Sequence, residues 1–205
     1  MLSHMRFAPR RQEALTSEPW FAGHGYAVSR TGAGGIGPAF ESGDAFPFCD
    51  SLVVGYGTRT DEDALKYLAT EWDVRVRGLR IAHEGMYHLD MSFCPLDSTH
   101  ALVYPAAFDA ASRAELERIV PVPIVLTDDE AFAFSANSIV VGDTVIMPAC
   151  SLRLQRVLTR LGLRVVVLDL SEFHKGGGSI RCMTNPLDTD LSAAQVPGGE
   201  VIVPA

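Results

Sequence analysis

A strand–strand–helix–strand pattern recurs three times in the middle of this 205-residue chain, and few folds accommodate such a repeat. In each copy a short apolar strand precedes a helical segment, a second strand follows it, and a further short strand lies ahead. The expected strand, helix and strand fall at 51–57, 61–71 and 74–81; at 101–104, 110–119 and 122–126; and at 144–147, 152–161 and 165–170. Repeats of one such unit stack or close into a ring, so we predict an α/β fold with approximate rotational symmetry.

The sequence on either side of these copies has the pattern of further, partial units. Residues 13–24 predict a helix and 26–29 a strand, whereas residues 179–184 predict an opening strand. We therefore expect one domain over residues 1–205, an incomplete α/β propeller of about three ββαβ units, with a loose tail from about 188 to 205. An ordinary open α/β sheet is the alternative for the same order of elements.

Composition excludes several classes of protein. Hydrophobic residues make up 47% of the chain and charged residues 20%, as in globular domains. No apolar run approaches the roughly 18 residues of a membrane span, and the first residues lack the apolar stretch of a signal peptide. The net charge of -8 argues against a nucleic-acid partner and favours a cationic small molecule. We expect a cytoplasmic protein without a membrane partner.

The four cysteines have no paired spacing. Cys49, Cys94, Cys150 and Cys182 are therefore expected to be reduced thiols, as is usual in the cytosol. No CxxC or HxxxH spacing points to zinc, and we expect no metal or other cofactor.

One cysteine follows an unusual run. Three glycines at 176–178 lie just ahead of Cys182, and Arg181 precedes the thiol directly. Glycines allow close approach to a ligand, and a neighbouring cation lowers a thiol pKa, so the run is suited to present a nucleophile. The alternative is a glycine hinge ahead of a buried, inert cysteine.

Acidic and imidazole groups occur at matching places in other units. Glu41 and His88 lie on or just before the opening strand of a unit, as Cys182 does, and Asp90 shares a strand face with His88. Equivalent positions meet at the axis of a ring, so a nucleophile, a proton shuttle and a carboxylate would converge. Asn137 lies ahead of the third copy, where it either hydrogen-bonds substrate or forms a turn.

Three motifs together resemble the guanidino-group-modifying enzymes, which include dimethylarginine dimethylaminohydrolases, arginine deiminases and amidinotransferases. The motifs are Phe-Glu-Ser-Gly-Asp at 40–44, Tyr-His-Leu-Asp at 87–90 and Gly-Gly-Gly-Ser-Ile-Arg-Cys at 176–182, and the resemblance runs from about residue 20 to 187. It implies the pentein fold, a five-bladed α/β propeller of ββαβ units. It also suggests that the chain lacks the family's first blades, which would leave an open edge through which copies self-associate.

The resemblance also assigns roles. It implies that Cys182 is the nucleophile, His88 the general acid/base, and Glu41 the carboxylate that contacts both histidine and substrate. Asp90 matches the acid that grips the guanidinium, and Asp44 closes the first motif. With Asp90, we expect Asp44, Asn137 and Arg181 to bind substrate.

These roles imply a hydrolase that converts a methylated arginine, or arginine itself, to citrulline through a covalent thiouronium on the cysteine. A small cationic guanidino compound is then the substrate. The same Cys, His and Glu site would also serve an amidinotransferase, in which an amine replaces water. A chain without its first blades is alternatively an inactive fragment or an arginine-binding module.

Overall fold

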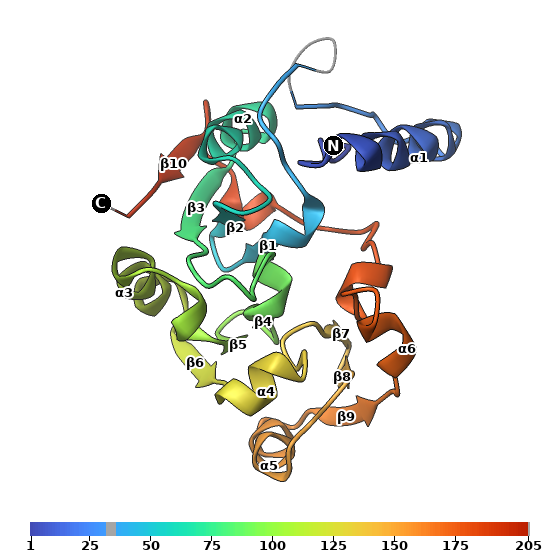
Figure 1. Ribbon diagram of the computed structural model, residues 1–205. Helices are drawn as coiled ribbons and strands as arrows, with labels where there is room; N and C mark the ends of the chain where they lie inside the picture. Colours follow the sequence, from blue (N-terminus) through green and yellow to red (C-terminus); the bar gives the residue numbers. More distant parts are fainter. Residues whose placement is uncertain (32–35, 205) are drawn as a thin grey trace.

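In the computed structural model, which describes residues 1–31 and 36–204, ten strands form three small mixed sheets. The sheets follow one another in an arc, and each carries its long helix on the outer side (Figure 1). In every sheet the first strand of the unit pairs antiparallel with the second, and the second pairs in parallel with the third. The predicted repeat of strand, strand, helix and strand is confirmed.

The three units have similar lengths. The first contains β1 (Ala45–Phe48), β2 (Ser51–Tyr56), α2 (Glu62–Trp72) and β3 (Arg75–Arg80). The second contains β4 (Phe93–Pro95), β5 (His100–Val103), α3 (Ala110–Ile119) and β6 (Val122–Val125). The third contains β7 (Ile139–Val141), β8 (Thr144–Met147), α5 (Leu152–Arg160) and β9 (Arg164–Val167).

Local capping explains where α3 and α5 begin. Asp109 and Ser151 precede α3 and α5, and their side chains accept from the amides of Ser112 and Leu154. The short helix α4 (Asp128–Phe132), which the sequence pattern did not predict, begins with a capping box formed by Thr127 and Glu130.

The N-terminal region matches the expectation only in part. Helix α1 (Arg11–Gly23), preceded by the 3-10 turn η1 (Ala8–Arg10), agrees with the predicted helix. The strand expected at 26–29 does not form; only an isolated bridge joins Leu2 to Arg30. Within the described ranges no helix is both long and apolar enough to cross a bilayer.

Two C-terminal expectations are wrong. Residues 179–184 form no strand but the 3-10 turn η5 (Arg181–Met183), which follows the short helix α6 (Ser171–His174) and the glycines. The tail from 188 is not loose throughout, because after η6 (Ser192–Ala194) the strand β10 (Glu200–Ile202) pairs in parallel with β3. The exposed edge of β3 offers unpaired backbone groups that such a strand satisfies.

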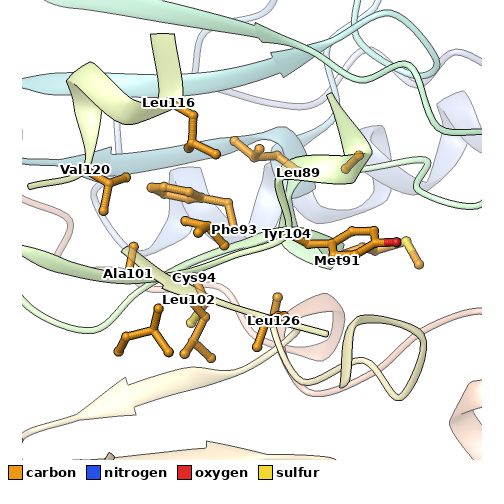
Figure 2. Close-up of a cluster of buried hydrophobic side chains, with 14 of the residues drawn as sticks. Leu89, Met91, Phe93, Cys94, Ala101, Leu102, Tyr104, Leu116, Val120 and Leu126 are labelled. Carbon is orange, nitrogen blue, oxygen red and sulfur yellow. The ribbon is translucent and has the colours of Figure 1, made fainter. Parts of the chain in front are cut away.

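One hydrophobic cluster contains buried side chains of all three units. Figure 2 shows Phe93 and the members of this cluster in and around the second sheet. The rings of Phe46 and Phe48 meet the Phe93 ring edge-on, with centroids 5.8 and 5.6 Å away. Cys94 points to the other face of β4, where its Sγ lies 3.6 Å from the carbonyl of Ser138 in the third unit. Because both faces of β4 are buried, neighbouring units hold one another in place, and the segments ahead of each sheet stay close together.

Candidate active site

A cavity of about 610 Å³ opens where the segments ahead of the sheets meet. Its walls come from the N-terminal residues, the 3-10 turns η2 (Ser42–Asp44), η3 (Leu89–Met91) and η5, the loop after β2, and the glycine run. Five of the seven predicted site residues line it, among them Glu41, His88, Asp90 and Cys182. Arg181 lines it as well, whereas Asp44 and Asn137 lie behind its wall.

Glu41 and His88 form a buried pair. The imidazole Nε2 of His88 lies 2.8 Å from Oε2 of Glu41, and the other carboxylate oxygen of Glu41 accepts from the backbone N–H of Arg6 at 2.9 Å. Burial opposes charge on both groups. The hydrogen bond with His88 nevertheless lowers the pKa of Glu41. The same hydrogen bond, together with the nearby carboxylates of Asp44 and Asp90, raises the pKa of His88. The pair therefore favours a carboxylate beside an imidazolium.

Gly43 makes room for the imidazole. A Cβ at this position would lie 2.8 Å from Nδ1 of His88 and 3.1 Å from Oδ2 of Asp90. Real carbon atoms do not approach that closely, so only glycine fits between these two side chains.

The thiol of Cys182 lies between two polar side chains. Its Sγ donates to Oδ2 of Asp90 at 3.4 Å and accepts from Nδ2 of Asn137 at 3.2 Å. Partial removal from water and the Asp90 carboxylate raise the pKa of Cys182 above its ordinary value. The expectation that Arg181 lowers this pKa is wrong, because the Arg181 guanidinium turns away and lies over the ring of Phe46, 4.8 Å from its centroid.

Asp90 carries an unused acceptor. Its side chain is buried, and Oδ1 has no hydrogen-bond partner among the described residues. Burial raises the pKa of Asp90 despite the opposing effect of His88. A buried acceptor without a partner is costly, and an N–H group in the adjoining cavity would satisfy it. The strand face expected to carry His88 and Asp90 is instead the turn η3, which His88 precedes directly.

Asp44 has a structural position rather than the expected contact with substrate. Its two oxygens accept from Oγ1 of Thr60 at 2.7 Å and from the amide of Leu89 at 2.8 Å, and burial raises its pKa to about 7. Thr60 in turn accepts from the amide of Glu41 at 3.1 Å. Asp44 thus ties the turn that carries Glu41 to the turn that follows His88.

Asn137 also faces inward instead of lining the cavity. It is fully buried, and its Oδ1 accepts from the amide of Arg181 at 2.9 Å. Its Nδ2 donates to the thiol of Cys182 and, at 3.4 Å, to the carbonyl of Asp90. The position ahead of the third sheet is therefore brought to the site, as predicted, but the Asn137 side chain contacts Arg181, Cys182 and Asp90 and does not line the cavity.

Arg59 and Tyr87 complete the cavity and were missed by the sequence reasoning. Arg59 Nη1 donates to Oε2 of Glu41 at 3.2 Å, and its guanidinium lies between the rings of Phe7 and Tyr87, 4.7 and 5.1 Å from their centroids. The hydroxyl of Tyr87 donates to the carbonyl of Gly177. The signal for Arg59 was its place in the loop after β2, at the end of the sheet where Glu41 also lies.

Comparison with known families places this cavity in context. A family model described as N,N dimethylarginine dimethylhydrolase, eukaryotic, matches residues 10–189. The bifunctional arginine dihydrolase/ornithine cyclodeaminase AgrE of Nostoc is 36% identical over 188 residues, 90% of this chain and 26% of AgrE. The N(G),N(G)-dimethylarginine dimethylaminohydrolase of Mycobacterium tuberculosis is 31% identical over 184 residues, 90% of this chain and 60% of the relative. The chain spans less than two thirds of either relative.

Solved structures agree with the sequence matches. The crystal structure of unliganded AgrE has a TM-score of 0.83 at 36% identity, over 88% of this chain and 27% of AgrE. The product-bound N-terminal domain of ArgZ, a cyanobacterial arginine dihydrolase, has a TM-score of 0.84 at 33% identity, over 98% of this chain and 71% of that domain. A dimethylarginine dimethylaminohydrolase from Pseudomonas aeruginosa in complex with citrulline, at 24% identity and a TM-score of 0.73, shares the fold.

Proposed function

Because the chain belongs to the N,N dimethylarginine dimethylhydrolase family, we propose that it hydrolyses the guanidino group of a methylated arginine or of arginine, with citrulline as product. The arc of ββαβ units is then part of the propeller expected for such enzymes. AgrE has been crystallised with L-arginine and the ArgZ domain with its product, so relatives of this fold hold such ligands.

The unpartnered Oδ1 of Asp90 carries the proposal. A guanidinium is a planar cation with N–H groups on every edge, and a carboxylate accepts them in pairs. With one edge on Asp90, the central carbon of the cation would lie near Sγ of Cys182, which already contacts the other oxygen of Asp90. The same cavity presents Glu41 to a second edge and His88 to the departing nitrogen.

The first step forms a bond between Sγ and the guanidinium carbon. A bound cation beside Asp90 offsets the carboxylate that raises the thiol pKa, so the proton of Cys182 leaves to solvent and the thiolate attacks. His88, held as imidazolium by Glu41, donates its proton to the departing amine or ammonia. A thiouronium on Cys182 remains, and His88 is neutral.

The second step consumes water. Neutral His88 takes a proton from a water molecule as the oxygen attacks the thiouronium carbon, and the carbon–sulfur bond then breaks. The second proton of that water is released to solvent as the ureido carbonyl forms, the sulfur leaves as a thiolate, and His88 is again an imidazolium. The net reaction exchanges one amine or ammonia for the oxygen of water.

Arg59 suits the other end of an amino-acid substrate. Its guanidinium lines the cavity, and its side chain is mostly buried against the rings of Phe7 and Tyr87. A fixed guanidinium donates two parallel hydrogen bonds to a carboxylate. We propose that Arg59 exchanges its bond with Glu41 for the substrate α-carboxylate, which would favour arginine derivatives over simple guanidines.

An assay of ureido product tests the proposal. The purified chain would be incubated with L-arginine, with asymmetric dimethylarginine and with agmatine, which has the same guanidino group but no carboxylate. We expect ureido product from at least one arginine compound and a rate at least tenfold lower with agmatine. The variant Cys182→Ala should abolish product, whereas the control Cys150→Ala, away from the cavity, should retain it.

Other outcomes distinguish the alternative functions. Transfer of the amidino group to an added amine, in place of ureido product, would identify an amidinotransferase. Binding of L-arginine by calorimetry without any product, in the wild-type chain, would identify a binding module and contradict the hydrolase.

A further inference from the structure

A rigid turn ahead of the third sheet reaches the thiol. Phe134 adopts a left-handed backbone with a φ of 62°, which a bulky residue rarely does unless its surroundings hold it. The backbone N–H of Asn137 donates to the carbonyl of Phe134 at 2.9 Å, and Oγ of Ser138 donates to the carbonyl of Ser135 at 2.8 Å. The turn therefore presents Asn137 in one conformation.

The side-chain amide of Asn137 joins three parts of the site. It accepts from the Arg181 backbone, and it donates to the sulfur of Cys182 and to the backbone carbonyl of Asp90. Every polar atom of its side chain is thus used, and the residue has no exposed surface. A side chain that served only the turn would need none of these three bonds.

A second contact fixes the same segment. The ring of His174, just before the glycine run, stacks on the ring of Phe134 with centroids 4.7 Å apart and planes 12° apart. His174 Nε2 also lies 3.2 Å from Oγ of Ser179. Both ends of the segment that carries the thiol are therefore anchored to the turn, one by stacking and one by the amide.

From these contacts we infer that Asn137 is the positioning residue for the nucleophile, holding the Cys182 sulfur beside Asp90 and stabilising its thiolate. The inference rests on the proposed hydrolase for its kinetic part, whereas its effect on thiol reactivity does not. The expected contact of Asn137 with substrate is replaced by a contact with the attacking atom.

The chemistry favours an amide at this position. A thiol donates to Asp90, but a thiolate can only accept, and Nδ2 of Asn137 is the neutral donor already in place. The other titratable and charged side chains that line the cavity with Cys182 are Arg10, Glu41, Arg59, Tyr87, His88 and Arg181. Of these side chains, none is recorded within hydrogen-bond distance of Sγ in the described residues.

Two substitutions separate positioning from packing. Asn137→Asp keeps the shape and the acceptor for Arg181 but places a carboxyl group against the sulfur. Asn137→Ala removes all three bonds. The matched control is Ser135→Ala, at a residue of the same turn. It breaks the bond from Oγ of Ser135 to the carbonyl of Ala149, which follows β8, and does not touch Cys182.

The first readout is the pH dependence of Cys182 alkylation by iodoacetamide without substrate, followed by mass spectrometry. We expect both Asn137 variants to shift the alkylation midpoint upward by at least half a pH unit, with the larger shift for Asn137→Asp. Ser135→Ala should leave the midpoint unchanged. If Asn137→Ala does not fold, the isosteric Asn137→Asp still gives the comparison.

The second readout is kinetic. With a turned-over substrate, kcat should fall about 10- to 100-fold in Asn137→Ala while KM changes less than threefold. An unchanged alkylation midpoint in both variants would overturn the inference, as would a loss confined to KM. If the wild-type chain releases no ureido product but the midpoint still shifts, the proposed hydrolase fails and the role of Asn137 in holding the thiol stands.

Discussion

The carboxylate of Glu41 meets the imidazole of His88 at 2.8 Å inside the protein, although 47 residues separate them in the sequence. The two residues precede the first and second sheets, so the contact exists only because neighbouring units pack at a fixed angle. It supplies the proton donor that the proposed reaction needs.

Replacing Glu41 should change the pH profile of the reaction. In Glu41→Gln the imidazolium loses its carboxylate partner, so the raised pKa of His88 falls. The acid form of His88 is then lost at a lower pH, so the alkaline limb of the pH profile of kcat should move to lower pH. The maximal rate should fall about 10²- to 10⁴-fold.

The control for this variant is Glu115→Gln, which removes another buried carboxylate, paired with Arg77 and Arg118 away from the cavity. It should lower stability but leave the pH profile in place. An identical profile in Glu41→Gln and wild type would show that Glu41 does not set the protonation of His88.

A single methyl group at Gly43 should disable the site. The added Cβ would lie 2.8 Å from Nδ1 of His88, so the imidazole must move away from Glu41 or from the cavity. We expect Gly43→Ala to lose at least 100-fold in kcat/KM, measured as ureido product. Gly23→Ala, where the same methyl group meets no atom within 4 Å, should retain full activity.

Neutralising Asp90 should have opposite effects on two measurements. The Asp90 carboxylate raises the thiol pKa, so Asp90→Asn should speed alkylation of Cys182 at pH 8 severalfold. The same change removes the negative charge and one of the two accepting oxygens that would bind the guanidinium, and hydrolysis should fall at least 100-fold. Parallel losses in both measurements would mean that the variant has disordered the site.

Asp44 should make the folded state more stable in mild acid than at neutral pH. Burial raises its pKa from 3.8 to about 7, so the folded state binds a proton that the unfolded state releases between about pH 4 and 7. Its contribution is fully present below about pH 4 and is lost as the pH rises through about 7. The upper limit on that loss is about 4 kcal/mol.

Asp44→Asn tests this linkage. Urea unfolding from pH 4 to 8 should give a flatter dependence of the free energy of unfolding in the variant than in wild type. Equal slopes would show that Asp44 is ionised in both states.

The repeat and most helices could be predicted from sequence because their signals are local. Apolar periodicity located α2, α3 and α5, and the equivalence of the segments ahead of each unit brought Glu41, His88 and Cys182 together correctly. Roles that depend on side-chain direction could not be predicted.

Asp44 and Arg181 illustrate this difference. Asp44 belongs to the same motif as Glu41, but its oxygens face Thr60 and Leu89. Arg181 adjoins Cys182, but the Arg181 guanidinium packs on the ring of Phe46, 135 positions away, and not beside the thiol. The pairing of β10 with β3 was equally hidden, because a three-residue strand carries almost no periodic signal.

The separation of the site's residues along the chain has a consequence in time. Each unit consists of neighbours in sequence, whereas Cys182 meets Asp90 across 92 positions and His88 meets Glu41 across 47. Closing long loops costs more entropy than forming local helices and hairpins. During refolding, far-ultraviolet circular dichroism should therefore recover before Cys182 acquires its native rate of alkylation. A folding intermediate between these two stages would have its helices and strands but not yet its assembled active site.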